Sequence, residues 1–86
     1  MKRNSGKRDL SEAAIAHALT KAGCDIEYAE RKPWDLLIGR AGQCYLLEIK
    51  GEAGTLTESQ VKFKQKWRGH YAVVRTPTEA LKAIGL

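Results

Sequence analysis

Two short apolar runs decide how this chain folds: Asp35-Leu36-Leu37-Ile38 and Cys44-Tyr45-Leu46-Leu47-Glu48-Ile49-Lys50. They flank Arg40-Ala41-Gly42-Gln43, and β-rich runs on either side of such a turn predict a hairpin. Side chains alternate between the two faces of a strand, so Glu48 and Lys50 share one face while Ile49 points to the other. Two carboxylates and an amine then meet at neighbouring strand ends. Such a set suits a divalent metal with a charged partner for a reacting group, which indicates a hydrolytic site.

Capping patterns predict a helix before this hairpin. Asp9 and Glu12 have the spacing of a capping box, and Gly23 supplies a stop, so we expect a helix over about 10–22. Glu12 falls on the same helical stripe as Leu19, which turns it inward. Its role at the cap and a role in the site are compatible, because a first-turn residue on the inward face can serve both.

A second helix is predicted after the hairpin. Thr57 begins it, with Gln60 as the capping partner, and Gly69 closes it. Gln60 shares an inward stripe with Phe63 and Trp67. This stripe favours a place for Gln60 in the site beside its capping role.

The remaining elements complete an α/β fold. We expect a short strand over 26–29, a buried strand over 71–74, and a last helix with Pro77 at its first position and Gly85 after its end. The order α-β-β-β-α-β-α predicts a small mixed sheet flanked by helices. The polar residues 1–8 are expected to form a basic flexible tail, and residues 9–86 a single domain.

The charge of the chain favours a polyanionic partner. Its 86 residues carry a formal net charge of +5. Eight basic residues are candidates for holding a phosphate backbone: Lys2, Arg3, Lys7, Arg8, Lys62, Lys64, Lys66 and Arg68. The alternative is a solvated lysine-rich face. A chain of this length buries only about 60–65% of its unfolded surface, so a dimer is plausible.

Several classes of protein are disfavoured. No stretch approaches the roughly 20 apolar residues of a membrane span, and the N-terminus lacks the core of a signal peptide, which favours the cytoplasm. Cys24 and Cys44 have no CxxC spacing and are expected to be two buried free thiols. His17 and His70 are expected at the surface or at caps. No glycine loop for a nucleotide cofactor is present.

The chain resembles the stand-alone VRR-NUC domains of phages, which belong to the PD-(D/E)xK nuclease superfamily and are related to Holliday-junction resolvases. The resemblance extends over nearly the whole chain from Asp9. It consists of the acid at 35, Glu48-Ile49-Lys50, Leu56-Thr57-Glu58-Ser59-Gln60, Trp67 before Gly69, and Ala72-Val73-Val74 followed by Glu79-Ala80-Leu81. One departure is that Trp34 separates Pro33 from Asp35, where the family places proline directly before the acid. Trp34 fills the space of that proline ring or presents an aromatic face to a base, and packing is favoured.

The resemblance implies a restriction-endonuclease-like core and a nuclease site. It implies that Asp35 and Glu48 bind one or two Mg²⁺ or Mn²⁺ ions, with the carbonyl of Ile49 in the oxygen shell. Lys50 would assist catalysis, and Glu12 and Gln60 would complete the site. A surface Glu/Lys pair at a strand edge is the alternative, but the strand is too apolar for a solvated edge.

The expected function is therefore metal-dependent DNA cleavage. We expect an endodeoxyribonuclease, a homodimer in the resolvase manner, acting on branched DNA such as four-way junctions. A flap, nick or general DNA nuclease would use the same residues. A non-catalytic DNA-binding module and an RNA-binding protein remain as alternatives from other classes.

Overall fold

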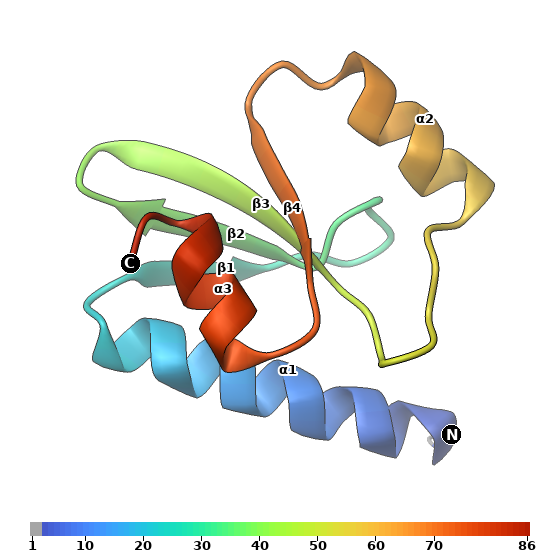
Figure 1. The fold of residues 1–86 in the computed structure, drawn as a ribbon, viewed down its shortest axis with the longest axis horizontal. Helices are drawn as coiled ribbons and strands as arrows, with labels where there is room; N and C mark the ends of the chain where they lie inside the picture. The colour runs from blue at the N-terminus through green and yellow to red at the C-terminus, as the bar shows by residue number, and fades with distance from the viewer. Residues whose placement is uncertain (1–2) are drawn as a thin grey trace.

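The computed structural model describes the backbone of residues 3–86 and the side chains of residues 11–86. Its elements follow the predicted order (Figure 1). They are α1 (Arg3–Lys21), β1 (Asp25–Tyr28), β2 (Leu36–Arg40), β3 (Gln43–Ile49), α2 (Glu58–Lys66), β4 (His70–Val74) and α3 (Pro77–Ala83). The predicted α/β class with a small mixed sheet is confirmed.

The four strands form one sheet in the order β1-β2-β3-β4. The β1/β2 and β2/β3 pairs are antiparallel, and β4 runs parallel to β3. A parallel neighbour requires a crossover connection, and the segment that contains α2 supplies it. The strand that carries Glu48 is therefore flanked by a strand on each side.

The structure confirms the β2–β3 hairpin that the sequence predicts, and its turn has two residues. Arg40 pairs with Gln43 across the turn, and the two residues between them have positive φ, 52° at Ala41 and 80° at Gly42. Positive φ at both central residues is the requirement of a type I′ turn, whose twist matches that of the flanking strands. This turn sets the register that places Leu36 opposite Leu47.

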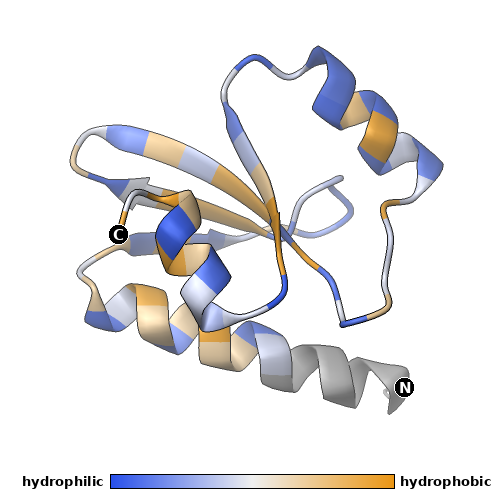
Figure 2. Cartoon of the chain, viewed as in Figure 1, coloured by the Kyte–Doolittle hydropathy of each residue, from blue (hydrophilic) through white to orange (hydrophobic). Residues whose placement is uncertain are grey.

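One face of the sheet forms the hydrophobic core. Helices α1 and α3 cover this face together (Figure 1). Figure 2 shows the apolar residues gathering in the strands and on the helix faces next to them. The core consists of Ile15, Leu19, Cys24, Leu36, Ile38, Leu47, Ile49, Val74, Ala80 and Ile84. Residues of β3 between these, Leu46 and Glu48, point to the opposite face.

Helix α2 lies apart from this core. It projects from the rest of the molecule in Figure 1, and none of its residues is buried. Thr57 caps it, and Gln60 completes the predicted capping box in both directions. The predicted stop at Gly69 is wrong, because the helix ends at Lys66. Trp67 is its C-cap in extended backbone, so helical spacing from Phe63 no longer turns the indole inward.

Three other expectations need correction. Helix α1 begins at Arg3 rather than near Leu10, because a capping pattern at Asp9 does not prevent helix before it. It therefore includes most of the segment 1–8 predicted as a tail. Cys24 is buried as expected, but Cys44 is exposed, since β3 begins at the exposed end of the hairpin. Ala22 lies past the end of α1 and is exposed.

The predictions for the last helix are confirmed. Thr76 accepts a hydrogen bond from the backbone of Glu79, and Pro77 is at the first position of α3. Gly85 follows the C-cap Ile84.

His17 and His70 are both exposed, as expected. Within the described part of the chain, no helix has the length and apolarity to cross a membrane.

Candidate catalytic site

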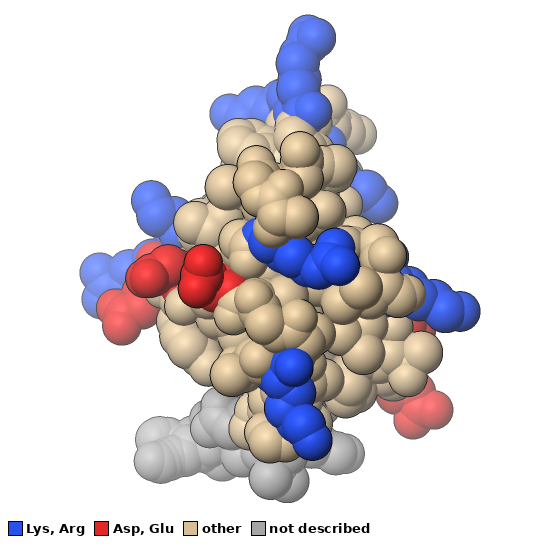
Figure 3. Space-filling view, turned by 90° about the vertical axis from the view of Figure 1, so that its left-hand side faces the viewer, with Lys and Arg blue, Asp and Glu red and all other residues tan. Residues whose placement is uncertain are grey.

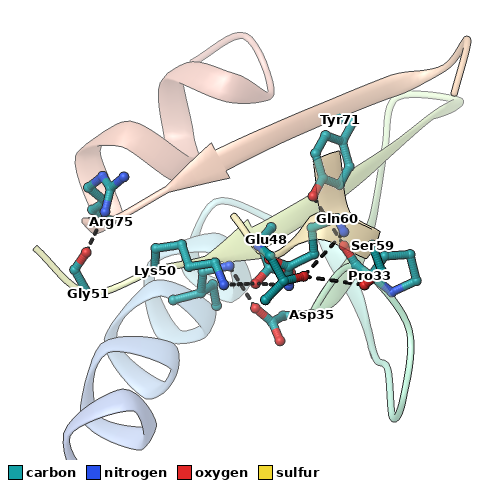
Figure 4. A network of polar contacts seen from close by, with 11 residues as sticks. Pro33, Asp35, Glu48, Lys50, Gly51, Ser59, Gln60, Tyr71 and Arg75 are labelled. Carbon is teal, nitrogen blue, oxygen red and sulfur yellow. Dashed lines mark hydrogen bonds and ion pairs between the residues drawn. The ribbon is translucent and has the colours of Figure 1, made fainter. Parts of the chain in front are cut away.

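The site is centred on a buried carboxylate. Glu48 lies near the end of β3, on the face opposite the core, and is only 2% exposed. Its Oε2 accepts a hydrogen bond from Gln60 Nε2 at 2.9 Å and lies 3.2 Å from Lys50 Nζ (Figure 4). Burying a charge is costly unless it is paired and hydrogen-bonded, and Glu48 has both kinds of partner.

Lys50 follows the last residue of β3. Its backbone N–H donates to the carbonyl of Val74 at 3.1 Å, which continues the parallel pairing one residue past the strand. The side chain therefore keeps the alternation of β3 and lies on the face of Glu48, as predicted. Lys50 is 16% exposed, so its ammonium is fixed by Glu48 while still reaching the surface.

Asp35 lies directly before β2 and links three segments. Its backbone N–H donates to Leu47 of β3 at 2.8 Å, and its carbonyl accepts from Ala29 at 2.9 Å. Its side-chain Oδ2 accepts from the backbone N–H of Ile49 at 2.7 Å. The structure thus brings Asp35 and Glu48 to neighbouring strand ends, and Figure 4 shows both carboxylates in one cluster with Lys50.

The Ile49 carbonyl faces the same side as Asp35. The N–H and C=O groups of a strand residue point to the same neighbouring strand, and the Ile49 N–H points to Asp35. The side chain of Ile49 is 2% exposed and belongs to the core on the other face. The Ile49 carbonyl oxygen therefore lies at the same end of the sheet as the carboxylates of Asp35 and Glu48.

Gln60 holds both of the roles that the sequence allowed. Its Oε1 accepts from the Thr57 backbone N–H at 2.8 Å, which closes the capping box. Its Nε2 donates to Glu48 at 2.9 Å. The Gln60 amide contains both an acceptor oxygen and a donor nitrogen, so this one side chain connects the start of α2 to the site. This contact sets the position of α2 over the carboxylate.

Glu12 is the one predicted site residue that the described contacts do not connect to this cluster. It is half-buried on α1, and α1 packs on the core face of the sheet. Within residues 11–86, the contacts described above for Asp35, Glu48 and Lys50 do not include Glu12. Its placement in the site therefore depends on the sequence pattern alone.

The predicted DNA-binding residues fall into two groups. The side chains of Lys2, Arg3, Lys7 and Arg8 lie outside the described residues. On α2 and just after it, Lys62, Lys64, Lys66 and Arg68 are all exposed. Figure 3 shows Lys and Arg side chains projecting from the end of the molecule that α2 forms, while acidic side chains lie lower in the view, at both its left and right edges.

Tyr71 and Arg75 are additional polar residues near the site. The Tyr71 hydroxyl donates to the carbonyl of Pro33 at 3.1 Å, two residues before Asp35. Burial, and secondarily the Glu48 carboxylate, raises the pKa of Tyr71 above its ordinary value. Arg75 donates from its guanidinium to the Gly51 carbonyl next to Lys50. No sequence pattern pointed to Arg75.

The donor set suits a hard cation that retains water. The described residues contain no group of three or more His, Cys, Asp or Glu side chains that could hold a metal. Two carboxylates and one carbonyl are all oxygen donors, and Mg²⁺ is commonly bound through one or two carboxylates with several waters. Asp35, Glu48 and the Ile49 carbonyl fit this pattern.

Comparison with known proteins returns no match. No family model matches the chain. No curated protein and no solved structure matches it either. The function is therefore inferred from the residues of the site and their geometry.

Proposed function

We propose that this protein is a metal-dependent endodeoxyribonuclease with a restriction-endonuclease-like site. The observation that carries the proposal is the environment of Glu48. A carboxylate 2% exposed at a strand end is held by Lys50 and Gln60, with the Asp35 carboxylate at the neighbouring strand end. These are the groups that the resemblance to PD-(D/E)xK nucleases implies.

A purely structural ion pair is the competing explanation. Replacing a buried ion pair by apolar residues of similar volume is often neutral or stabilising, so such a pair is weak evidence for stability. The face opposite the core contains Leu46 and Tyr71 beside Glu48. An apolar residue at 48 would pack there without the cost of desolvating a charge. A paired charge at this position is better explained by a role in chemistry than by a contribution to stability.

The residues of the site have distinct roles in this proposal. Asp35, Glu48 and the Ile49 carbonyl would hold Mg²⁺ or Mn²⁺, one or two ions per site. When bound, the metal lowers the pKa of a water and neutralises charge on the scissile phosphate. The Lys50 ammonium stabilises negative charge that develops on the phosphate or positions the water. Gln60 orients the Glu48 carboxylate, and Glu12 remains a candidate for an outer position.

The exposed basic residues of α2 would hold the phosphate backbone without reading the sequence. Branched DNA, such as a four-way junction, is the proposed substrate. A homodimer would place two such sites on opposed strands. Cleavage of flaps, nicks or duplex DNA in general would use the same site. A cleavage assay that compares these substrates with a four-way junction distinguishes the alternatives.

The test is a cleavage assay with matched variants. The purified protein is incubated with labelled four-way junction, flap, linear duplex and single strand, in Mg²⁺, in Mn²⁺ and in EDTA. We expect metal-dependent cuts that Asp35→Asn abolishes. Asp25→Asn, which changes an exposed aspartate on β1, is the matched control and keeps full activity.

Metal binding is measured separately by titration calorimetry with Mn²⁺. The wild-type protein is expected to bind the ion, and Asp35→Asn to bind it more weakly. Symmetric cuts at the junction support the resolvase-like substrate, while cuts confined to flap or duplex transfer the same chemistry to another DNA. DNA binding without cleavage in either metal would contradict the enzyme and leave a binding module.

A further inference from the structure

An aromatic side chain is exposed at the end of α2. Trp67 is 43% exposed, and Val61 on the same helix is 38% exposed. Tryptophan in a folded domain usually buries most of its large apolar area. An indole left in water at the end of a helix with no buried residues therefore calls for a ligand or a structural reason.

The indole is held in one position. Its Nε1 donates to the His70 carbonyl at 3.2 Å, and its ring stacks on Phe63 with centroids 5.3 Å apart and planes 20° from parallel. Gly69 lies against it, since a Cβ there would come within 2.9–3.0 Å of the indole atoms Nε1, Cε2 and Cζ2. A ring fixed by three neighbours loses little conformational entropy when a ligand stacks on it.

The charges around Trp67 favour an anionic ligand. Lys66 and Arg68 are its sequence neighbours, and both are exposed. No acidic residue occurs between Glu58 and Glu79. Surfaces that bind single-stranded nucleic acid combine exposed aromatic rings with cationic side chains. The bases stack on the rings, and the cations contact the phosphate backbone.

The aromatic residues lead from Trp67 toward the candidate site. Phe63 stacks on Trp67 and makes an edge contact with Tyr71, with centroids 5.4 Å apart. Gln60, one turn before Phe63, donates to Glu48. At 1.5 Å per residue, the six positions from Gln60 to Lys66, the last residue of α2 before Trp67, correspond to about 9 Å along the helix. That distance is about three stacked nucleotides at 3.4 Å each.

We propose that Trp67, supported by Phe63 and flanked by Lys66 and Arg68, is a stacking site for an unpaired base of DNA. The base would lie a few nucleotides from a phosphate at Glu48 and Lys50. The site thus selects DNA that exposes a single-stranded segment next to the bond to be cut, such as a flap or an open junction. The stacking site itself is independent of the nuclease function, but the selection of DNA for cutting rests on that proposed function.

The test measures binding in EDTA, where no metal-dependent cleavage occurs. A Trp34→Phe background leaves Trp67 as the single tryptophan, and its fluorescence is followed during titration with short oligothymidylate. The matched ligand has the same number of phosphates and abasic sites in place of bases. We expect quenching and affinity about 5- to 150-fold tighter for the ligand that has bases.

Two variants in the same background, followed by anisotropy of labelled DNA, test the residue. Trp67→Ala removes the difference between the two ligands, and Trp67→Phe keeps most of it. Val61→Ala, at the other exposed apolar side chain of α2, is the control and changes nothing. The ligand comparison uses an intact Trp67, so it remains decisive if Trp67→Ala folds poorly.

Three results would overturn the proposal. Equal affinity for the abasic ligand would show that phosphate charge alone is bound. Equal competition by polyglutamate would show a general polyanion surface. Tighter binding of oligouridylate than of oligothymidylate would assign the site to RNA. Failure of the cleavage assay removes the nuclease but not the stacking site, so the two proposals fail separately.

Discussion

Replacing the Glu48–Lys50 pair separates its contribution to stability from its contribution to chemistry. Glu48→Gln keeps the shape of the side chain, and its amide carbonyl still accepts from Gln60. It removes the negative charge 3.2 Å from the Lys50 ammonium. Losing one partner of a buried pair costs about 3–5 kcal/mol. Since Lys50 is 16% exposed, its ammonium can reach water, so we expect about 2–3 kcal/mol.

The whole domain is expected to have about 4–13 kcal/mol of stability, so this loss is large but leaves a folded state. The midpoint of thermal unfolding should fall by roughly 4–8 °C for each kcal/mol. Adding Lys50→Met removes the unpaired ammonium while keeping an unbranched side chain. The double variant should therefore return to within about 1 kcal/mol of the wild-type protein.

The assay combines urea unfolding, followed by circular dichroism, with cleavage of DNA in Mg²⁺. Stability should recover in the double variant, whereas cleavage should remain lost in both variants. A double variant as unstable as Glu48→Gln would refute the view that the two residues act as a pair. Cleavage by either variant would refute the role of the Glu48 carboxylate.

Three further predictions concern the turn, the indole and the sheet. Ala41 has a φ of 52°, where asparagine is better tolerated, so Ala41→Asn should raise the free energy of unfolding by about 0.5–1 kcal/mol; an unchanged urea midpoint would contradict the turn. Gly69→Ala should displace Trp67, seen as a shifted fluorescence maximum and weaker binding of single-stranded DNA, while Gly51→Ala, with open space around its Cβ, should leave both unchanged. Burial raises the pKa of Tyr71, so the folded state holds this proton more tightly than the unfolded chain; the resulting stabilisation is complete below pH 10 and lost as pH rises through the folded-state pKa. Unfolding measured from pH 9 to 11 should show a shallower decline for Tyr71→Phe than for the wild-type protein.

Local patterns predicted the elements well where one residue type has a specific backbone role. The hairpin turn at Ala41-Gly42 and the capping box at Thr57 are contained in four consecutive residues each, so no tertiary contact is needed to recognise them. The end of α2 was predicted less well. Trp67 leaves the helix because its indole binds the His70 carbonyl and packs over Gly69, and both contacts depend on the path of the chain after the helix.

The pairing of site residues shows the same division. Alternation along β3 placed Glu48 and Lys50 on one face, because period two is a property of the strand itself. The partners that Asp35 finds come from outside that pattern. Its carboxylate accepts from Ile49, and its backbone contacts Leu47 of β3 and the residue just after β1, because its position beside β3 follows from the hairpin register.

The sequence by itself determined the order of the elements, the mixed character of the sheet and the strand face of Glu48, since these follow from periodicities and short-range turns. Only the tertiary structure decided that Gln60 reaches Glu48, that Tyr71 holds the segment before Asp35, and that Trp67 remains exposed. The Gln60 contact and the exposure of Trp67 depend on where the β3–β4 crossover sets α2 relative to the sheet, and the Tyr71 contact depends on where β4 lies relative to the segment before β2. Local spacing does not contain that placement, because it results from packing between segments far apart in the chain.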